Sequence, residues 1–348
     1  MRSYVTGGAP GPDEVPIDLV DEDGLEEWLA GQPEATRRWV LASGFDARAH
    51  TRCLVPDARH ELGSVLVGVA GPAAPLDPWC CADLPTALPA RRFRIRTGLE
   101  AADLERTAVG WGLGAYRFDR YRGKGQERER AVLCTDPGTA LRAGRQIDAI
   151  ALVRDLINTP AGDLLPGDLF EAARSLADRF GARCSCITGD ELVANGYPAI
   201  HAVGRASADP PRLVDLRWGA PDAPRVTLAG KGVCFDTGGL DLKPASGMRL
   251  MKKDMGGAAH VLGLARLVMS SDLPVRLRVL IPAVENAVAG NAYRPGDVLA
   301  TRAGITVEVD NTDAEGRIVL CDALTEAASE EPEAVSYTHL TLPTKRIV

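Results

Sequence analysis

Hydrophobic positions recur at two spacings, which alternate through the second half of the chain. Apolar residues at helical spacing predict helices at residues 140–157, 168–181, 256–271 and 316–330. Apolar runs without that spacing predict buried strands between them, at residues 225–235, 275–284 and 305–310. Strands that alternate with helices indicate an α/β fold, a mainly parallel doubly wound sheet with helices on both faces.

The first half of the chain follows a less regular pattern. Residues 62–71 form an apolar run that predicts a buried strand, and residues 107–121 form an apolar segment interrupted by glycine. The stretch 121–131 is highly charged and contains glycine, so it predicts an exposed loop. No motif in this half indicates a chemistry.

Length and composition fit a soluble protein of two domains. The chain has 348 residues, and domains usually contain about 100–200 residues each. Hydrophobic residues make up 45% and charged residues 25%, which is ordinary for globular proteins. Because the pattern changes ahead of the helix at 140–157, we expect a smaller α/β domain over residues 1–136 and a second domain over 137–335.

Charge and terminal sequence exclude some classes of function. The net charge of −7 disfavours a nucleic-acid partner, because phosphate binding needs a basic face. The sequence has no apolar run of about 18 residues, the length that a membrane span requires. Its amino terminus is acidic and broken by glycine and proline, unlike a signal peptide, so we expect a cytoplasmic protein. The eight cysteines lack zinc-site spacing and predict reduced, buried thiols.

Three groups of polar residues fall at or just beyond predicted strand ends, where sheets of this kind bind ligands. These residues are Lys231, Asp236, Lys243, Asp254, Asp313, Glu315 and Arg317. Alternate residues of an extended chain point the same way, so the last three would face one point if their segment stays extended. Crowded carboxylates repel one another unless cations neutralise them. The oxygen-rich set therefore favours divalent Mg, Mn or Zn.

Each group also has an ordinary structural interpretation. Asp254 precedes two glycines and an apolar helix, so it could be a helix N-cap. Asp313 and Glu315 could be exposed turn residues, and Lys231 a surface lysine. The sequence has five histidines and no H-E-x-x-H motif, so a zinc site built from histidine is not expected.

The block NTDAEGRIVLCDAL (311–324) closely resembles the signature of the leucyl, or cytosol, aminopeptidases, a family of two-metal exopeptidases. The segment GKGVCFDTGGLDLKPASGMRLMKKDMGGAA (230–259) resembles the metal-binding segment of that family. The stretch RDLINTPAGDLLP (154–166) is similar to the start of its catalytic domain. The resemblance covers residues 150–335.

The resemblance implies an aminopeptidase that releases leucine-like residues from peptides with a free N-terminus, working as a homohexamer. It implies two divalent ions, Mn²⁺, Zn²⁺ or Mg²⁺, bound by Lys231, Asp236, Asp254, Asp313 and Glu315. Lys243 and Arg317 match the catalytic pair of the family. Lys243 would stabilise a developing oxyanion, and Arg317 would hold a bicarbonate that acts as general base.

The resemblance breaks off after Val335. The family would continue with a strand and a pocket-lining loop similar to TLTGA, whereas this chain reads SYTHLTLPTKRIV (336–348). We interpret residues 336–348 as a non-native tail on a truncated catalytic domain. Because an incomplete sheet exposes apolar surface and an open edge, we expect the chain to be poorly soluble or inactive and the hexamer to be disfavoured.

Other functions fit parts of the pattern. A two-metal phosphoesterase would use similar carboxylates, but it needs an anion-binding loop that the sequence lacks. A DNA-binding or regulatory relative of the aminopeptidases would need a basic stripe, which the net charge of −7 disfavours. A non-catalytic or inactive fragment of the family is the remaining alternative.

Overall fold

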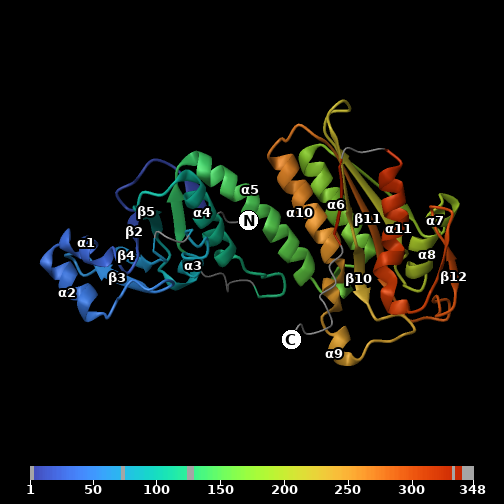
Figure 1. Ribbon diagram of the computed structural model, residues 1–348, viewed down its shortest axis with the longest axis horizontal. Coiled ribbons are helices and arrows are strands. Elements are labelled where there is room, and N and C mark those ends of the chain that lie inside the picture. Colours follow the sequence, from blue (N-terminus) through green and yellow to red (C-terminus); the bar gives the residue numbers. More distant parts are fainter. Residues whose placement is uncertain (1–3, 72–74, 124–128, 331–333, 339–348) are drawn as a thin grey trace. The chain divides into compact units, whose positions relative to one another are not determined.

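The computed structural model describes residues 4–71, 75–123, 129–330 and 334–338, the last range as backbone only. The chain divides into two compact units, residues 1–151 and 152–348 (Figure 1). Each unit is built around a sheet of its own. Within the described ranges, the structure has no helix with the length and apolar character to cross a membrane.

The sheet of the first unit is mainly parallel. Its described strands lie in the order β1-β6-β5-β2-β4-β3, and the β3–β4 pair at one edge is antiparallel. The strands are β1 (Val5–Gly7), β2 (Val15–Val20), β3 (Arg52–Pro56), β4 (Leu62–Gly68), β5 (Arg92–Ile95) and β6 (Val132–Thr135). The helices are α1 (Leu25–Ala30), α2 (Glu34–Ala42), α3 (Leu84–Ala87), α4 (Ala101–Ala115) and the start of α5 (Pro137–Asn158).

The main core of the first unit lies between its strands and α4. Ile17 of β2, Phe93 of β5 and Trp111 of α4 are fully buried there. The strand expected at residues 62–71 is β4, whereas most of the apolar segment 107–121 belongs to α4. Residues 124–128 of the expected exposed loop lie outside the described residues.

The sheet of the second unit has the order β14-β9-β11-β8-β7, and β10 continues the line of β9 along β11. The pairs of β11 with β9 and β10 and of β9 with β14 are parallel, whereas β8 is antiparallel to β11 and β7. The strands are β7 (Arg183–Thr188), β8 (Arg212–Trp218), β9 (Arg225–Gly230), β10 (Gly232–Asp236), β11 (Arg276–Asn286) and β14 (Ala334–Thr338).

Helices cover both faces of this sheet, as the alternation of the sequence predicted. The α-helices are α6 (Pro166–Phe180), α7 (Glu191–Ala194), α8 (Pro198–Gly204), α9 (Ala245–Met248), α10 (Gly256–Ser270) and α11 (Glu315–Ala328). Short 3₁₀ turns are η1 (Ala161–Asp163), η2 (Met251–Met255) and η3 (Thr312–Ala314). A separate antiparallel pair consists of β12 (Val298–Ala300) and β13 (Thr306–Glu308).

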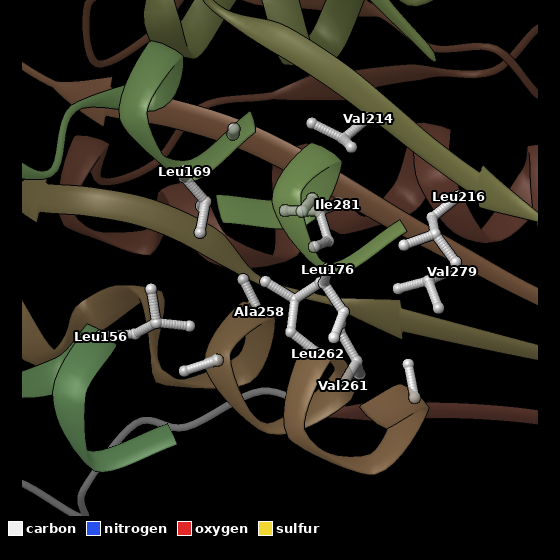
Figure 2. Packing of buried hydrophobic residues seen from close by; sticks show 14 of the residues in the cluster. Leu156, Leu169, Leu176, Val214, Leu216, Ala258, Val261, Leu262, Val279 and Ile281 are labelled. Carbon is white, nitrogen blue, oxygen red and sulfur yellow. The ribbon is translucent and has the colours of Figure 1, made fainter. Parts of the chain in front are cut away.

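Strand β11 lies at the centre of the sheet and supplies side chains to both cores. Val279 and Ile281 face the core that α6 and α10 cover, whereas Leu280 and Val284 face the core that α8 and α11 cover. Figure 2 shows the first of these cores, where side chains of α6 and α10 meet those of β8 and β11. This alternation follows from the two-residue period of a strand and makes β11 a rigid support for the residues at its carboxyl end.

The four helices predicted in the second half are confirmed as α5, α6, α10 and α11. Their signals are local ones, so short stretches of sequence are enough to find them. Gly181, for example, adopts φ 65° directly after α6, a left-handed conformation that glycine adopts without steric cost.

Two strand predictions need correction. The strand expected over residues 225–235 is interrupted at Lys231, which separates β9 from β10. The strand expected over residues 305–310 is β13, which pairs with β12 outside the main sheet. The third polar group of the sequence therefore does not follow a strand of the main sheet.

Candidate metal centre

Lys231 occupies the break between β9 and β10. The backbone departs from regular strand geometry there, and the side chain is almost completely buried, with the whole residue 1% exposed. Its Nζ lies 2.8 Å from Asp254 Oδ2 and 2.7 Å from Glu315 Oε1. Burial alone would lower the pKa of Lys231, but the charges of Glu315 and Asp254 outweigh it and raise the pKa. Lys231 thus connects η2 with the start of α11.

Asp236 ends β10, and the loop that follows carries Lys243. Asp236 Oδ1 accepts hydrogen bonds from the Gly238 amide and from Asn286 Nδ2, both at 2.8 Å. Its other oxygen, Oδ2, lies 2.9 Å from Lys243 Nζ. Lys243 also forms an ion pair with Asp313. The loop therefore folds back so that one ammonium group bridges two carboxylates.

Asp313 and Glu315 lie on a helical turn and not on extended chain. The Asn311 side chain caps η3 by accepting a hydrogen bond from the Asp313 amide at 2.7 Å, and Glu315 is the first residue of α11. The expectation that residues 313, 315 and 317 share one face of an extended segment is therefore wrong. Glu315 is buried and Arg317 exposed, because residues two apart on a helix point in nearly opposite directions, about 200° apart.

The carboxylates of Asp236, Asp313 and Glu315 converge, and one oxygen from each lies within 4.8 Å of the others. Burial raises the pKa of Glu315 to about 8, and the charges of Asp236 and Asp254 act in the same direction against the opposing charge of Lys231. Burial also raises the pKa of Asp254 and of Asp313. The three carboxyl groups are hard to ionise at the same time, because their negative charges would lie close together in a buried site. A bound cation would offset this repulsion.

The donor set fits divalent metal ions. Glu315 Oε2 is buried and has no hydrogen-bond partner among the described residues. Buried polar atoms without a partner are rare in proteins, and a carboxylate oxygen is a hard ligand that suits Mn²⁺, Mg²⁺ or Zn²⁺. Asp254 does not act as the N-cap of α10, because no side chain caps that helix by a hydrogen bond.

Six of the seven predicted site residues are brought together by these contacts: Lys231, Asp236, Lys243, Asp254, Asp313 and Glu315. Arg317 is exposed, and its side chain makes no hydrogen bond or ion pair within the described part of the chain. Its assignment as the anchor of a bicarbonate stays a prediction.

Sequence reasoning missed the buried polar residues that hold the site together. Asn286 ends β11 and contacts Asp236, and Thr312 lies next to Asp313. Tyr293 donates a hydrogen bond from its hydroxyl group to the Thr312 carbonyl at 2.6 Å. A signal was present: Thr312 stands inside the block that carried the resemblance, and Asn286 follows a predicted strand by two residues.

Comparison with known proteins identifies the family. The model for the catalytic domain of the cytosol aminopeptidase family matches residues 151–344, which is more than half of the chain. This chain belongs to the cytosol aminopeptidase family. The model for the N-terminal domain of M17 aminopeptidases matches residues 15–134. The catalytic match includes part of the segment 336–348, and the backbone of β14 runs through residues 334–338 in parallel with β9.

Similar curated proteins include two probable cytosol aminopeptidases. The protein of Syntrophotalea carbinolica is 44% identical over 240 residues, which are 64% of this chain and 48% of that protein. The protein of Rhodococcus jostii is 39% identical over 255 residues, 69% of this chain and 50% of that protein. This cytosol aminopeptidase family member thus spans about half the length of the curated relatives it matches.

Solved structures of other enzymes have the same architecture. The cytosol aminopeptidase from Coxiella burnetii overlays with a TM-score of 0.93 at 44% identity, over 99% of this chain and 74% of that chain. The bottromycin maturation enzyme BotP in complex with Mn gives a TM-score of 0.81 at 32% identity, over 94% of this chain and 73% of that chain. The predicted fold class, an α/β N-terminal domain followed by a mainly parallel α/β catalytic domain, is confirmed.

Proposed function

We propose that this cytosol aminopeptidase family member carries the catalytic centre of a two-metal aminopeptidase, which releases leucine-like residues from the N-terminus of peptides. The observation that carries the proposal is the convergence of Asp236, Asp313 and Glu315 within 4.8 Å, together with the unpartnered Oε2 of Glu315. Relatives named cytosol aminopeptidase and the manganese complex of BotP support it.

Two divalent ions, Mn²⁺ or Zn²⁺, would be held by Lys231, Asp236, Asp254, Asp313 and Glu315. Ions in such a site supply polarisation of a carbonyl group and a water molecule of lowered pKa. Lys231 can act as a ligand only as a neutral amine. The carboxylates that raise its pKa would be neutralised by a dication, and the dication would itself repel an ammonium group, so both effects favour loss of the proton.

Lys243 and Arg317 would act on the peptide. The Lys243 ammonium group lies between Asp236 and Asp313, which keeps it charged and places it at the rim of the carboxylate cluster. From there it can donate a hydrogen bond to an oxygen that gains negative charge during attack. Arg317 is exposed next to the cluster in sequence, and its planar guanidinium group suits a planar anion such as bicarbonate.

The charge of the cluster favours exopeptidase action. An acidic site attracts the protonated amino terminus of a peptide. An internal peptide bond carries no positive charge and is not attracted in this way. A cytoplasmic location belongs to the same proposal, and so does the homohexamer that the family resemblance implies, for the full-length parent of this chain.

The test compares metal content and peptidase activity in matched variants. We expect the wild-type chain to bind Mn²⁺ or Zn²⁺. When the chain is extended by the rest of the family's catalytic domain, we expect it to release leucine from leucine amide. Asp313→Ala should lose metal and activity, and Lys243→Ala should lose activity but keep its metal. Asp297→Ala, an acidic residue outside the cluster, is the control. Full metal occupancy and activity in Asp313→Ala would refute the ligand assignment, and salt-sensitive DNA binding in a gel shift would favour the regulatory alternative.

A further inference from the structure

Asn286 connects the two segments that carry the carboxylate cluster, the end of β10 and the turn η3. It ends β11 and is 0% exposed. Its Nδ2 donates hydrogen bonds to Asp236 Oδ1 at 2.8 Å and to the Thr312 carbonyl at 3.0 Å. One amide group therefore touches both the end of β10 and the turn η3. Asp236 is 50 residues from Asn286 and Thr312 is 26 residues from it, so this contact exists only in the folded chain.

The orientation of the Asn286 amide is fixed by its neighbours. Both partners of Nδ2 are hydrogen-bond acceptors, so a reversed amide would place Oδ1 against two oxygens. The Asn286 backbone is held as well, since its carbonyl accepts hydrogen bonds from the Thr237 amide at 3.1 Å and from Thr237 Oγ1 at 2.8 Å. The side chain of Asn286 is thus held through Nδ2, and its backbone through the carbonyl group.

Thr312, the second partner of Asn286, is held by each of its polar groups. Its amide donates to Asp241 Oδ2 at 2.7 Å, and its hydroxyl group donates to the Gly238 carbonyl at 2.6 Å. Its carbonyl accepts from Tyr293 as well as from Asn286. Because Thr312 is the residue before Asp313, these bonds fix the start of the turn from which Asp313 and Glu315 project.

Asn286 also determines which oxygen of Asp236 is available to bind a cation. Oδ1 of Asp236 already accepts two hydrogen bonds, from Asn286 and from the Gly238 amide. Its Oδ2 faces Lys243 and so remains the oxygen that a cation would use. A neutral amide performs this task without adding another negative charge to a site that already contains several.

We propose that Asn286 is a positioning residue that sets the separation between Asp236 and the Asp313–Glu315 pair, and so allows one site to hold two ions side by side. The inference rests on the proposed two-metal function. Paired ions of this kind lie about 3.5–4 Å apart. A small displacement of Asp236 relative to the turn that carries Asp313 and Glu315 would therefore disrupt the ion pair. Outer partners of metal ligands change metal affinity about 10–100-fold when they are removed.

The variant that tests this is Asn286→Asp, which keeps the shape of the side chain but replaces Nδ2 by an oxygen that cannot donate once the carboxyl group is ionised, as a neighbouring dication favours. We expect Mn²⁺ affinity, measured by titration calorimetry on the metal-free 348-residue chain, to fall by about 10–100-fold. The electron paramagnetic resonance spectrum should change from that of a coupled Mn²⁺ pair to that of isolated ions. Asn291→Asp is the matched control, because Asn291 is exposed and donates to the Arg205 carbonyl at 2.7 Å.

A purely structural role would lower the melting temperature and leave the coupled spectrum unchanged, and that result would overturn the inference. If Asn286→Asp does not fold, Asn286→Ala removes the same donor without adding charge. It should weaken binding of the second Mn²⁺ ion several-fold, and unchanged binding would count equally against the inference. A wild-type chain that binds neither Mn²⁺ nor Zn²⁺ would refute the proposed function itself, whereas normal pair binding in both variants would refute the role of Asn286 alone.

Discussion

Replacing Lys231 by methionine should destabilise the metal-free chain strongly. The side chains have similar length, but methionine carries no charge, so Asp254 and Glu315 would lose the ammonium group that lies 2.8 and 2.7 Å from them. Both carboxylates are buried, at 4% and 1% exposure. Removing one partner of a buried ion pair costs about 3–5 kcal/mol, because the remaining charge has lost its compensation.

Protonation of a buried carboxylate limits the free energy of unfolding that the Lys231→Met variant loses. The variant can avoid two buried charges by binding a proton to Asp254, whose usual pKa is 3.8. Holding such a group protonated at pH 7 costs about 4 kcal/mol at 1.36 kcal/mol per pKa unit. Glu315, whose pKa burial raises to about 8, binds a proton more readily than Asp254 and so adds less to the cost. We therefore expect a loss of about 4 kcal/mol, or roughly 8–16 °C in melting temperature for a unit of this size.

Thermal unfolding followed by circular dichroism, in a chelator and then with Mn²⁺, measures the effect. The difference between variant and wild type should appear in the chelator, where no ion neutralises these carboxylates, and Mn²⁺ should stabilise the wild type further than the variant, because the variant lacks the Lys231 ligand and binds the ions more weakly. Lys252→Met is the control, because Lys252 donates a hydrogen bond to the Asn158 carbonyl at 2.6 Å and its loss costs about 1 kcal/mol. A Lys231→Met chain that melts within about 2 °C of wild type in the chelator, well short of that range, would refute the reasoning.

Three further results are expected. Gly239→Ala should lose about 1–2 kcal/mol in urea unfolding, because Gly239 has φ 67° and other residues resist that conformation; an unchanged midpoint would contradict this. Arg278→Ala should lose about 1.5–3 kcal/mol, since the buried guanidinium lies 2.7 Å from the Asp215 and Glu326 carboxylates, which would keep only Arg217 and Arg302 as partners, and a loss below 1 kcal/mol would show that these arginines or water replace it. Glu14→Gln should destabilise the chain at pH 7. The Arg94 guanidinium lowers the pKa of Glu14 from 4.5 to about 2, so its stabilisation is present above pH 4.5 and disappears as the pH falls toward 2, where variant and wild type should melt alike.

The helices of the second unit were predictable from short stretches of sequence. Helix α6 illustrates this, since it begins at Pro166 and ends before Gly181, and both residues signal helix ends through their own backbone preferences. The first unit was less predictable. Its described strands are three to seven residues long, too short for hydrophobic periodicity to identify each of them, and their pairing joins distant segments such as β1 and β6.

The sequence by itself determined the chemistry of the site, because residue type decides what a side chain can bind. Lys231, Asp236 and Glu315 were identifiable from the blocks in which they stand. Tertiary structure decided how they meet. Contacts between distant residues produce three features of the site: the break at Lys231, the helical turn at Asp313, and the position of the Asn286 amide between β10 and η3. The contact between Lys231 and Glu315, for example, joins residues 84 positions apart. Local sequence preferences do not encode such contacts, since they form only when buried polar groups find partners in the packed chain.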